Sequence, residues 1–282
     1  MGGEVRNIRL VLEYDGTNYH GFQTQDDPAL PTIQGELEAA IEAICHERLR
    51  ITGSGRTDAG AHALGQVVNF HTRSTVPTHR FPAALNSVLP RDIRVKEAAA
   101  VPQEFHARFD ALSKTYAYLV DNRPSTSVFL RNYAYHVPQP LDLVAMRRAA
   151  EILVGTHDFA SFQASGSSAK TSVRTVYGLG IDEIEAHEGI IKFSVRADGF
   201  LYNMVRNMVG TLLEVGLGRY SVEDTASILA ARDRRLAGPT APAQGLYLVK
   251  VEYGLRTDGS PPRSQDPGLR HLSRCPLGQL RH

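Results

Sequence analysis

The chain contains little cysteine and no long hydrophobic run. Its 282 residues include two cysteines, Cys45 and Cys275, which are too few and too far apart for a disulfide framework or a zinc ribbon. No stretch approaches the roughly 18 uninterrupted apolar residues of a membrane helix. The first residues lack the apolar segment of a secretory signal, and Arg6 stands where a myristoylation motif requires serine or threonine. These absences predict a cytoplasmic, reduced protein that does not associate with membranes.

The motifs of several common enzyme classes are also absent. The sequence has no GxxxxGK[ST] phosphate loop, no GxGxxG behind a predicted strand, and no convincing Ser-His-Asp grouping. Its 11 histidines show no HxxxH spacing and there is no CxxC pair. Scattered histidines are more often surface or core residues than metal ligands, so the sequence does not indicate a metal site.

Charge is distributed unevenly along the chain. The formal net charge is +1, but residues 1–47 carry −7 and residues 48–131 carry +6. Of the 31 basic residues 26 are arginine, whose guanidinium group binds phosphate with two parallel hydrogen bonds. A local basic region can attract a polyanion even when the whole protein is nearly neutral. On charge alone we prefer the simpler interpretation, an arginine-rich composition with a solvated surface.

Hydrophobic periodicity predicts the same order of elements twice. The first set of expected strands and helices lies at residues 8–14 (strand), 32–47 (helix), 48–53 and 66–72 (strands), 78–88 (helix) and 92–98 (strand). The second set lies at 115–120 (strand), 141–154 (helix), 173–184 and 190–196 (strands), 201–215 and 221–231 (helices) and 246–253 (strand). Thr32 and the Ser221/Asp224 pair are expected to cap two of these helices.

This order predicts an α+β protein made of two ferredoxin-like β-α-β-β-α-β halves. We expect a mixed, mainly antiparallel sheet with helices packed on one face and an active-site cleft between the halves. The halves are expected at residues 1–110 and 111–254. Residues 255–282 are rich in Pro, Arg, Ser and Gly and are expected to form a disordered tail.

One glycine-rich segment could carry chemistry. Residues 53–62 read GSGRTDAGAH, so the guanidinium of Arg56 and the carboxylate of Asp58 lie two residues apart on a loop that allows close backbone approach. A carboxylate on a rigid loop can act as a nucleophile, a base or a metal ligand. The alternative is a structural aspartate that caps the amides of its own loop, with a solvated arginine beside it. A hydrolase with two carboxylates also stays open, although no second acid lies in a comparable segment.

Three further segments contain residues that could act together with this loop. Tyr116 and Tyr118 share one face of a predicted strand, where an aromatic ladder is the simpler interpretation. Arg206 interrupts an otherwise apolar helix, and a buried cation is costly unless an anion pairs with it. A position at the solvated edge of the helix is the alternative, but the apolar neighbours favour a buried partner. Residues 245–249 (GLYLV) read as a core strand.

Taken together, residues 8–254 resemble the TruA family of tRNA pseudouridine synthases. Residues 14–23 (YDGTNYHGFQ) are similar to the opening block of the family, with Phe22 where tryptophan is common. Residues 55–62 (GRTDAGAH) match its catalytic block, with Ala61 in place of the usual valine. The remaining blocks follow in family order, at residues 106–109, 155–159, 204–210 and 245–248.

The resemblance implies a role for each of five side chains. Asp58 would be the catalytic aspartate, which attacks either the uracil ring or the ribose C1′. Arg206 would pair with Asp58 and keep it ionised and oriented. Tyr116 would stack on the flipped uracil and help to remove its C5 proton. Arg56 would occupy the space that the base vacates, and Leu246 would line the pocket with Tyr116.

The resemblance also implies the substrate and the assembly. The family isomerises uridine to pseudouridine at positions 38, 39 and 40 of the tRNA anticodon stem-loop, without net hydrolysis and without a metal or organic cofactor. It is homodimeric, with one tRNA lying across both subunits. Two other hypotheses are a non-catalytic RNA-binding module on the same fold and a metabolic enzyme on a ferredoxin-like scaffold.

Overall fold

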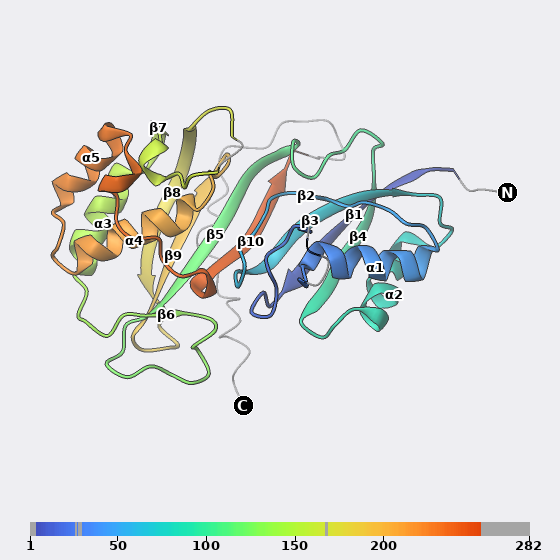
Figure 1. The fold of residues 1–282 in the computed structure, drawn as a ribbon, viewed down its shortest axis with the longest axis horizontal. Coiled ribbons are helices and arrows are strands. Elements are labelled where there is room, and N and C mark those ends of the chain that lie inside the picture. The colour runs from blue at the N-terminus through green and yellow to red at the C-terminus, as the bar shows by residue number, and fades with distance from the viewer. Residues whose placement is uncertain (1–3, 26, 28–29, 167–168, 255–282) are drawn as a thin grey trace.

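A computed structural model describes residues 4–25, 27, 30–166 and 169–254 (Figure 1). The tail predicted at residues 255–282 lies outside the described residues.

The first half contains most of the elements expected for it. They are β1 (Arg6–Tyr14), α1 (Ile33–Cys45), β2 (Thr52–Gly53), β3 (His62–Thr72), α2 (Phe81–Val88) and β4 (Ile93–Val101). The predicted cap of α1 is confirmed, because the hydroxyl of Thr32 accepts a hydrogen bond from the amide of Gly35. The helix ends at His46, which adopts the left-handed conformation.

The second half repeats this order and adds two short strands that the sequence did not predict. Its elements are β5 (Ala111–Asp121), β6 (Tyr135–His136), α3 (Leu143–Ile152), β7 (Gly155–Asp158), β8 (Val173–Glu183), β9 (Ile190–Ala197), α4 (Met204–Gly216), α5 (Val222–Ala231) and β10 (Leu246–Tyr253). The capping box at the start of α5 is confirmed: Ser221 and Asp224 each accept a hydrogen bond from the other's backbone amide.

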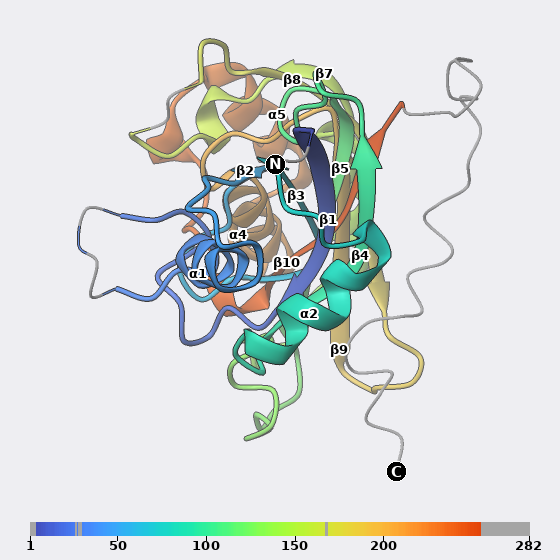
Figure 2. The ribbon, with the colours of Figure 1, turned by 90° about the vertical axis from the view of Figure 1, so that its right-hand side faces the viewer.

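The strands form one open sheet in the order β4-β1-β3-β10-β5-β9-β8-β7, with β2 added to β3 and β6 added to β5. The two halves share one topology, β4-β1-β3-β2 in the first and β10-β5-β9-β8 in the second, and β7 is added outside β8. Most pairs are antiparallel, and β3–β10 and β5–β6 are parallel. The helices lie on one side of the sheet (Figure 2). The predicted α+β fold is therefore confirmed.

The two halves meet where the second strand of the first half is short. The sequence predicted a strand over residues 48–53, but β2 covers Thr52 and Gly53 alone. The amide of Ile51 instead donates to the carboxylate of Glu38 on α1, which takes the preceding chain away from the sheet. Because β2 occupies one end of the β3 edge, the other end is free for β10.

The glycine-rich loop lies at this seam. Residues 54–61 connect β2 to β3, and His62 at the start of β3 pairs in parallel with Tyr247 of β10. A continuous apolar core lies between the helices and the sheet in both halves, and a smaller apolar cluster around Leu119 and Leu130 covers part of the other face. The loop therefore projects where the two repeats are joined.

Candidate active site

The opening block of the sequence holds the glycine-rich loop from one side. The amide of Phe22 donates to the carbonyl of Thr57 at 3.1 Å. Gly21 has φ +92°, and a Cβ added there would lie 2.8 Å from the same carbonyl oxygen. A side chain at Gly21 would therefore be strained and would displace the loop. This contact brings two of the segments singled out in the sequence, residues 14–23 and 55–62, together in the structure.

Buried polar side chains of β1 and β3 bind the glycine-rich loop from the sheet. The amide group of Gln66 donates to the carbonyl of Gly55 at 2.9 Å, and its oxygen accepts from the hydroxyl of Ser54 at 2.6 Å. The hydroxyls of Tyr14 and Thr57 are 2.8 Å apart. Burial raises the pKa of Tyr14 to about 12, so this phenol stays protonated. A buried and fully bonded network of this kind fixes the loop in one conformation.

Asp58 and Arg206, 148 residues apart in sequence, form an ion pair across the seam. Arg206 Nη1 lies 2.6 Å from Asp58 Oδ2, and the side chains are 16% and 23% exposed. The same Nη1 donates to Asn203 Oδ1 at 3.0 Å, and Nε donates to the carbonyl of Ala241 at 2.7 Å. The guanidinium is thus held by three groups, and the expected buried partner of Arg206 is Asp58.

Asn203 adopts an unusual backbone conformation at this point. It precedes α4 with φ +58°, in the left-handed region that asparagine tolerates better than most residues. In this conformation its side chain does not cap the helix but accepts from Arg206. The first turn of α4 therefore presents the guanidinium toward the loop.

Tyr116 lies on β5 beside this pair. It is 7% exposed, and its ring meets the ring of Phe200 edge to face with centroids 4.9 Å apart. A Cβ added at Gly55 would lie 3.9 Å from its hydroxyl oxygen. Within the described part of the chain this hydroxyl has no hydrogen-bond partner. Burial raises the pKa of Tyr116, and negative charge on Tyr14 or Asp58 raises it further, so the phenol is neutral at physiological pH.

The other two predicted site residues are placed differently. Leu246 is buried and lies opposite Tyr118 in the β10–β5 register, whereas Leu248 lies opposite Tyr116. Leu246 is therefore a diagonal neighbour of Tyr116, within reach of an aromatic ring. Arg56 is exposed, and its guanidinium forms no ion pair or hydrogen bond with the described residues. The structure thus groups Asp58, Arg206 and Tyr116 and leaves Arg56 in solvent beside them.

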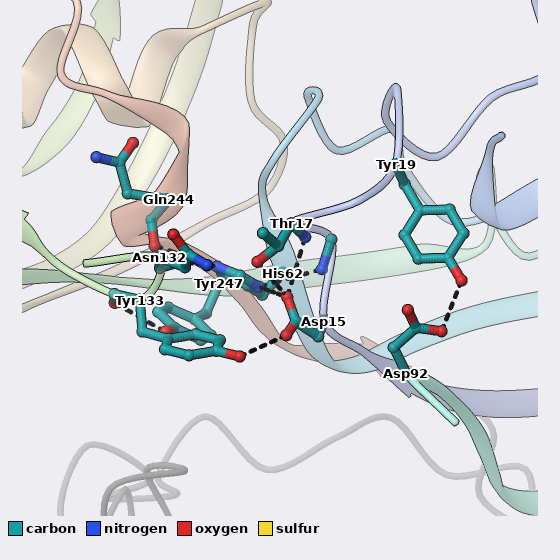
Figure 3. A network of polar contacts seen from close by, with 10 residues as sticks. Asp15, Thr17, Tyr19, His62, Asp92, Asn132, Tyr133, Gln244 and Tyr247 are labelled. Atoms are coloured by element: carbon teal, nitrogen blue, oxygen red, sulfur yellow. Dashed lines mark hydrogen bonds and ion pairs between the residues drawn. The ribbon is translucent and has the colours of Figure 1, made fainter. Parts of the chain in front are cut away.

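A second polar network closes the end of the loop (Figure 3). His62 is buried there, with Nδ1 3.2 Å from Asp15 Oδ1 and Nε2 3.0 Å from the carbonyl of Asn132. The hydroxyl of Tyr133 donates to Asp15 Oδ2 at 2.6 Å. Burial alone would raise the pKa of Asp15, but the contact with His62 and hydrogen bonds from Thr17 and Tyr133 hold it well below its usual range. This network ties the loop to the second half of the molecule.

Several of these residues do not stand out in the sequence. Gln66 and the Asp15–Tyr133 contact were not singled out, because the partners lie 11 and 118 residues apart. Asn203 lies three residues before Arg206, but its contact depends on a left-handed backbone conformation that the sequence does not indicate. One local signal was available: Gln66 is a polar residue directly before the apolar pair Val67 and Val68 of a predicted strand. A buried polar residue in such a position is expected to have a specific partner.

Two further findings concern residues 4–25, 27, 30–166 and 169–254. Among them there is no group of three or more His, Cys, Asp or Glu side chains that could hold a metal ion. None of their helices is long and apolar enough to cross a membrane.

Comparison with known proteins places this site in a family. Residues 10–110 and 149–254 match the sequence model of a family described as tRNA pseudouridine synthase. The chain is 50% identical over 249 residues to tRNA pseudouridine synthase A of Acetivibrio thermocellus, covering 88% of this chain and 100% of that protein. It is 51% identical over 249 residues to tRNA pseudouridine synthase A of Syntrophomonas wolfei, covering 88% of this chain and 98% of that protein.

A third relative gives the same result: the chain is 50% identical over 249 residues to tRNA pseudouridine synthase A 2 of Clostridium tetani, with 88% of this chain and 99% of that protein covered. These matches define an enzyme of the pseudouridine synthase class, and the chain belongs to the TruA family of tRNA pseudouridine synthases. The resemblance inferred from the sequence is confirmed, as is the prediction of an isomerase rather than a non-catalytic RNA-binding module.

Proposed function

We propose that this protein converts uridine to pseudouridine at positions 38, 39 and 40 of the tRNA anticodon stem-loop, with Asp58 as the attacking group. The observation that carries the proposal is the Asp58–Arg206 ion pair beside Tyr116, on a loop that is fixed from both sides. In this reaction the glycosidic bond breaks, the uracil turns, and its C5 bonds to C1′. No water is consumed, so one carboxylate suffices.

The geometry of Asp58 suits attack by one defined oxygen. Oδ2 accepts from Arg206, whereas Oδ1 has no hydrogen-bond partner among the described residues. An arginine held by three groups fixes the plane of the carboxylate and leaves Oδ1 with its lone pairs directed at the substrate. Attack on the ribose C1′ and attack on the uracil ring both need this arrangement. Positioning of a reacting atom in this way can remove several kcal/mol from a barrier.

Tyr116 has two roles in the proposal. Its ring stacks on the flipped uracil, and base–aromatic stacking contributes roughly 1–3 kcal/mol. Its hydroxyl is a poor proton acceptor in the free enzyme, because burial and the charge of Asp58 raise its pKa. Once the Asp58 carboxylate has become an ester, its negative charge is gone and the Arg206 guanidinium loses its counterion. Both changes lower the pKa of Tyr116, so the phenol loses its own proton to solvent more readily. The resulting phenolate, and not the neutral phenol, then accepts the C5 proton.

Arg56 and Leu246 complete the pocket. The unpaired and exposed guanidinium of Arg56 can enter the space that the flipped base vacates, because it breaks no ion pair of the described residues when it moves. Leu246 supplies an apolar wall near Tyr116 and excludes water from the detached uracil.

We propose a cytoplasmic homodimer with one tRNA across both subunits, and halves divided between residues 110 and 111, just before β5. The support is electrostatic. Residues 48–131 have a net charge of +6 and include the loop with Asp58, whereas the whole chain is nearly neutral at +1. Two copies of this basic segment can contact more backbone phosphates than one, as RNA recognition through shape and backbone requires.

The test is tritium release from unmodified tRNA labelled with [5-³H]uridine, with the wild type and Asp58→Asn in parallel. We expect release with the wild type and none with the variant, while both bind the tRNA. Transcripts that keep uridine at position 38, 39 or 40 alone then map the target. The absence of release by the wild type would exclude the proposed activity, and release by Asp58→Asn would exclude the role of Asp58.

A further inference from the structure

A largely buried lysine lies next to the site and has no part in the chemistry proposed above. Lys114 precedes Tyr116 by two residues on β5, so both side chains point to the same face, roughly 6–7 Å apart along the strand. Its Nζ donates to the carbonyl of Ser54 at 2.6 Å. A Cβ added at Gly55 would lie 3.3 Å from this Nζ and 3.9 Å from the Tyr116 hydroxyl oxygen. The ammonium therefore touches the start of the catalytic loop at the edge of the uracil pocket.

Two guanidinium groups accompany this ammonium. Burial lowers the pKa of Lys114 to about 8, and the positive charges of Arg108 and Arg174 contribute to the decrease. Arg174 on β8 packs against Gly199, where an added Cβ would lie 3.4 Å from Nε. The next residue, Phe200, contacts the ring of Tyr116. Lys114 and Arg174 thus approach the Tyr116–Phe200 contact from two separate segments, and Arg108, in a third segment, adds its positive charge to the surroundings of Lys114.

None of the three cations forms an ion pair with a carboxylate of the described residues, although other arginines near the seam do. Arg108 lies over the ring of Phe109 at 5.7 Å, and Arg174 donates to carbonyl groups of its own segment. Arg206, by contrast, pairs with Asp58. Like charges that gather without a counterion destabilise the free protein and create a site for an anion.

We propose that Lys114, Arg108 and Arg174 bind a backbone phosphate of the RNA next to the target uridine. This inference rests on the proposed function and adds the ligand of a subsite to it. A phosphodiester presents an anion at a short distance from the base that enters the pocket. Lys114 has three N–H donors and uses one for Ser54, so it can contact the phosphate and the catalytic loop together. The site therefore connects the position of the RNA backbone to the loop that carries Asp58.

The first test measures the salt dependence of tRNA binding. Unmodified tRNA is bound to Asp58→Asn protein, which prevents turnover, with and without Lys114→Met. We expect Lys114→Met to weaken binding by roughly tenfold and to reduce the slope of log K against log[salt] by about 0.7–0.9, as for one lost phosphate contact. Lys192→Met is the matched control, because Lys192 lies on β9 and pairs with Leu119 on the opposite face of the sheet. An unchanged slope for Lys114→Met would overturn the proposal.

The second test neutralises the phosphate itself. Full-length tRNA is ligated with one methylphosphonate linkage, placed on the 5′ or the 3′ side of the target uridine. We expect one of the two to weaken binding to the parent protein by about tenfold and to weaken binding to Lys114→Met no further, since a charge-assisted contact contributes this much once. Equal losses in both proteins, or no loss at either position, would overturn the proposal. A purely structural role of Lys114 gives equal losses.

Two additional variants separate binding from folding. Arg108→Gln changes an exposed side chain and Arg174→Gln a partly exposed one, and each is expected to repeat the pattern of Lys114→Met with native thermal stability. Tritium release by the wild-type protein tests the proposed function independently of the phosphate site. Normal release together with unchanged slopes refutes the phosphate site alone, and absent release refutes the function.

Discussion

Two aspartates at the seam of the molecule are held in opposite ways. Both oxygens of Asp15 are engaged: Oδ1 contacts Thr17 and His62, and Oδ2 accepts from Tyr133. Asp58 uses Oδ2 for Arg206 and leaves Oδ1 free among the described residues. The saturated carboxylate fixes the end of the loop, and the half-occupied one lies in its middle. In this molecule the carboxylate proposed to react is therefore distinguished less by its burial than by an oxygen left without a partner among the described residues.

The largest effect is expected from Asp58→Asn. The amide can still accept from Arg206 through its oxygen, so the fold and the thermal midpoint should change little, but an amide is not a nucleophile under these conditions. Tritium release should fall by at least about 10⁴-fold, the scale seen when a nucleophile is removed. Wild-type turnover in a variant shown by mass spectrometry to be free of deamidated protein would contradict the assignment.

The second effect is expected from Tyr116→Phe, which keeps the ring and removes the hydroxyl. If the phenol accepts the C5 proton, turnover should drop by roughly 10²–10⁴-fold while tRNA affinity stays within a few-fold. Single-turnover tritium release and a binding titration separate the two quantities. Full activity of the variant would reduce the role of Tyr116 to stacking.

The third effect concerns stability as well as activity. Arg206→Ala leaves Asp58 partly buried without its cation and removes the hydrogen bonds to Asn203 and Ala241. Because both charges are partly solvated, we expect a loss of about 2–3 kcal/mol in the free energy of unfolding, below the range for fully buried pairs, together with inactivity. Urea denaturation measures the change in the free energy of unfolding. A denaturation midpoint equal to that of the wild type would argue against the pair as a stabilising contact.

The smallest effect on activity is expected from a substitution of Asp15, the aspartate with both oxygens engaged. Asp15→Asn weakens the contacts with His62 and Tyr133, so we expect a loss of about 1–2 kcal/mol at pH 7 with turnover within a few-fold of the wild type. Because the pKa of Asp15 is lowered in the folded protein, this contribution is complete above the unfolded pKa and disappears as the pH falls through the folded value.

The measurement for Asp15→Asn is urea denaturation at a series of pH values. The stability difference between wild type and variant should be constant near neutrality and shrink below about pH 4, the ordinary range of an aspartate. A difference that grows toward acid would reverse the assigned direction of the shift. A large loss of turnover in a stable Asp15→Asn protein would remove the distinction between the two aspartates.

Much of the fold could be predicted from periodicity because each element has a local signal. The alternation in β1, the Thr32 cap of α1 and the capping box of α5 all lie within a few residues. The strand predicted at residues 48–53 was largely wrong, since the amide of Ile51 is bound by a glutamate of α1 and not by the sheet. A local pattern holds no information about such a partner.

In the candidate site, too, some residues have a local signal in the sequence and others depend on distant partners. The glycine-rich context of Asp58 and the isolated charge of Arg206 are visible in the sequence, and each suggests a need for a partner. Lys114 gave no such signal, because a lysine beside a tyrosine on a strand is ordinary until the loop at Ser54 and the guanidinium groups of two distant segments are placed around it.

Periodicity and short motifs were enough to predict the two repeated halves, to indicate the family, and to single out one carboxylate and one arginine from a normal core and surface. The folded chain was needed to show that these two groups meet, that Asp58 keeps one oxygen free among the described residues, and that Lys114 lies beside Tyr116 and the catalytic loop. The reason is physical. Periodicity and capping act over a few residues, whereas the parallel pairing of β3 with β10 brings together groups nearly two hundred residues apart, through a register that no local pattern specifies.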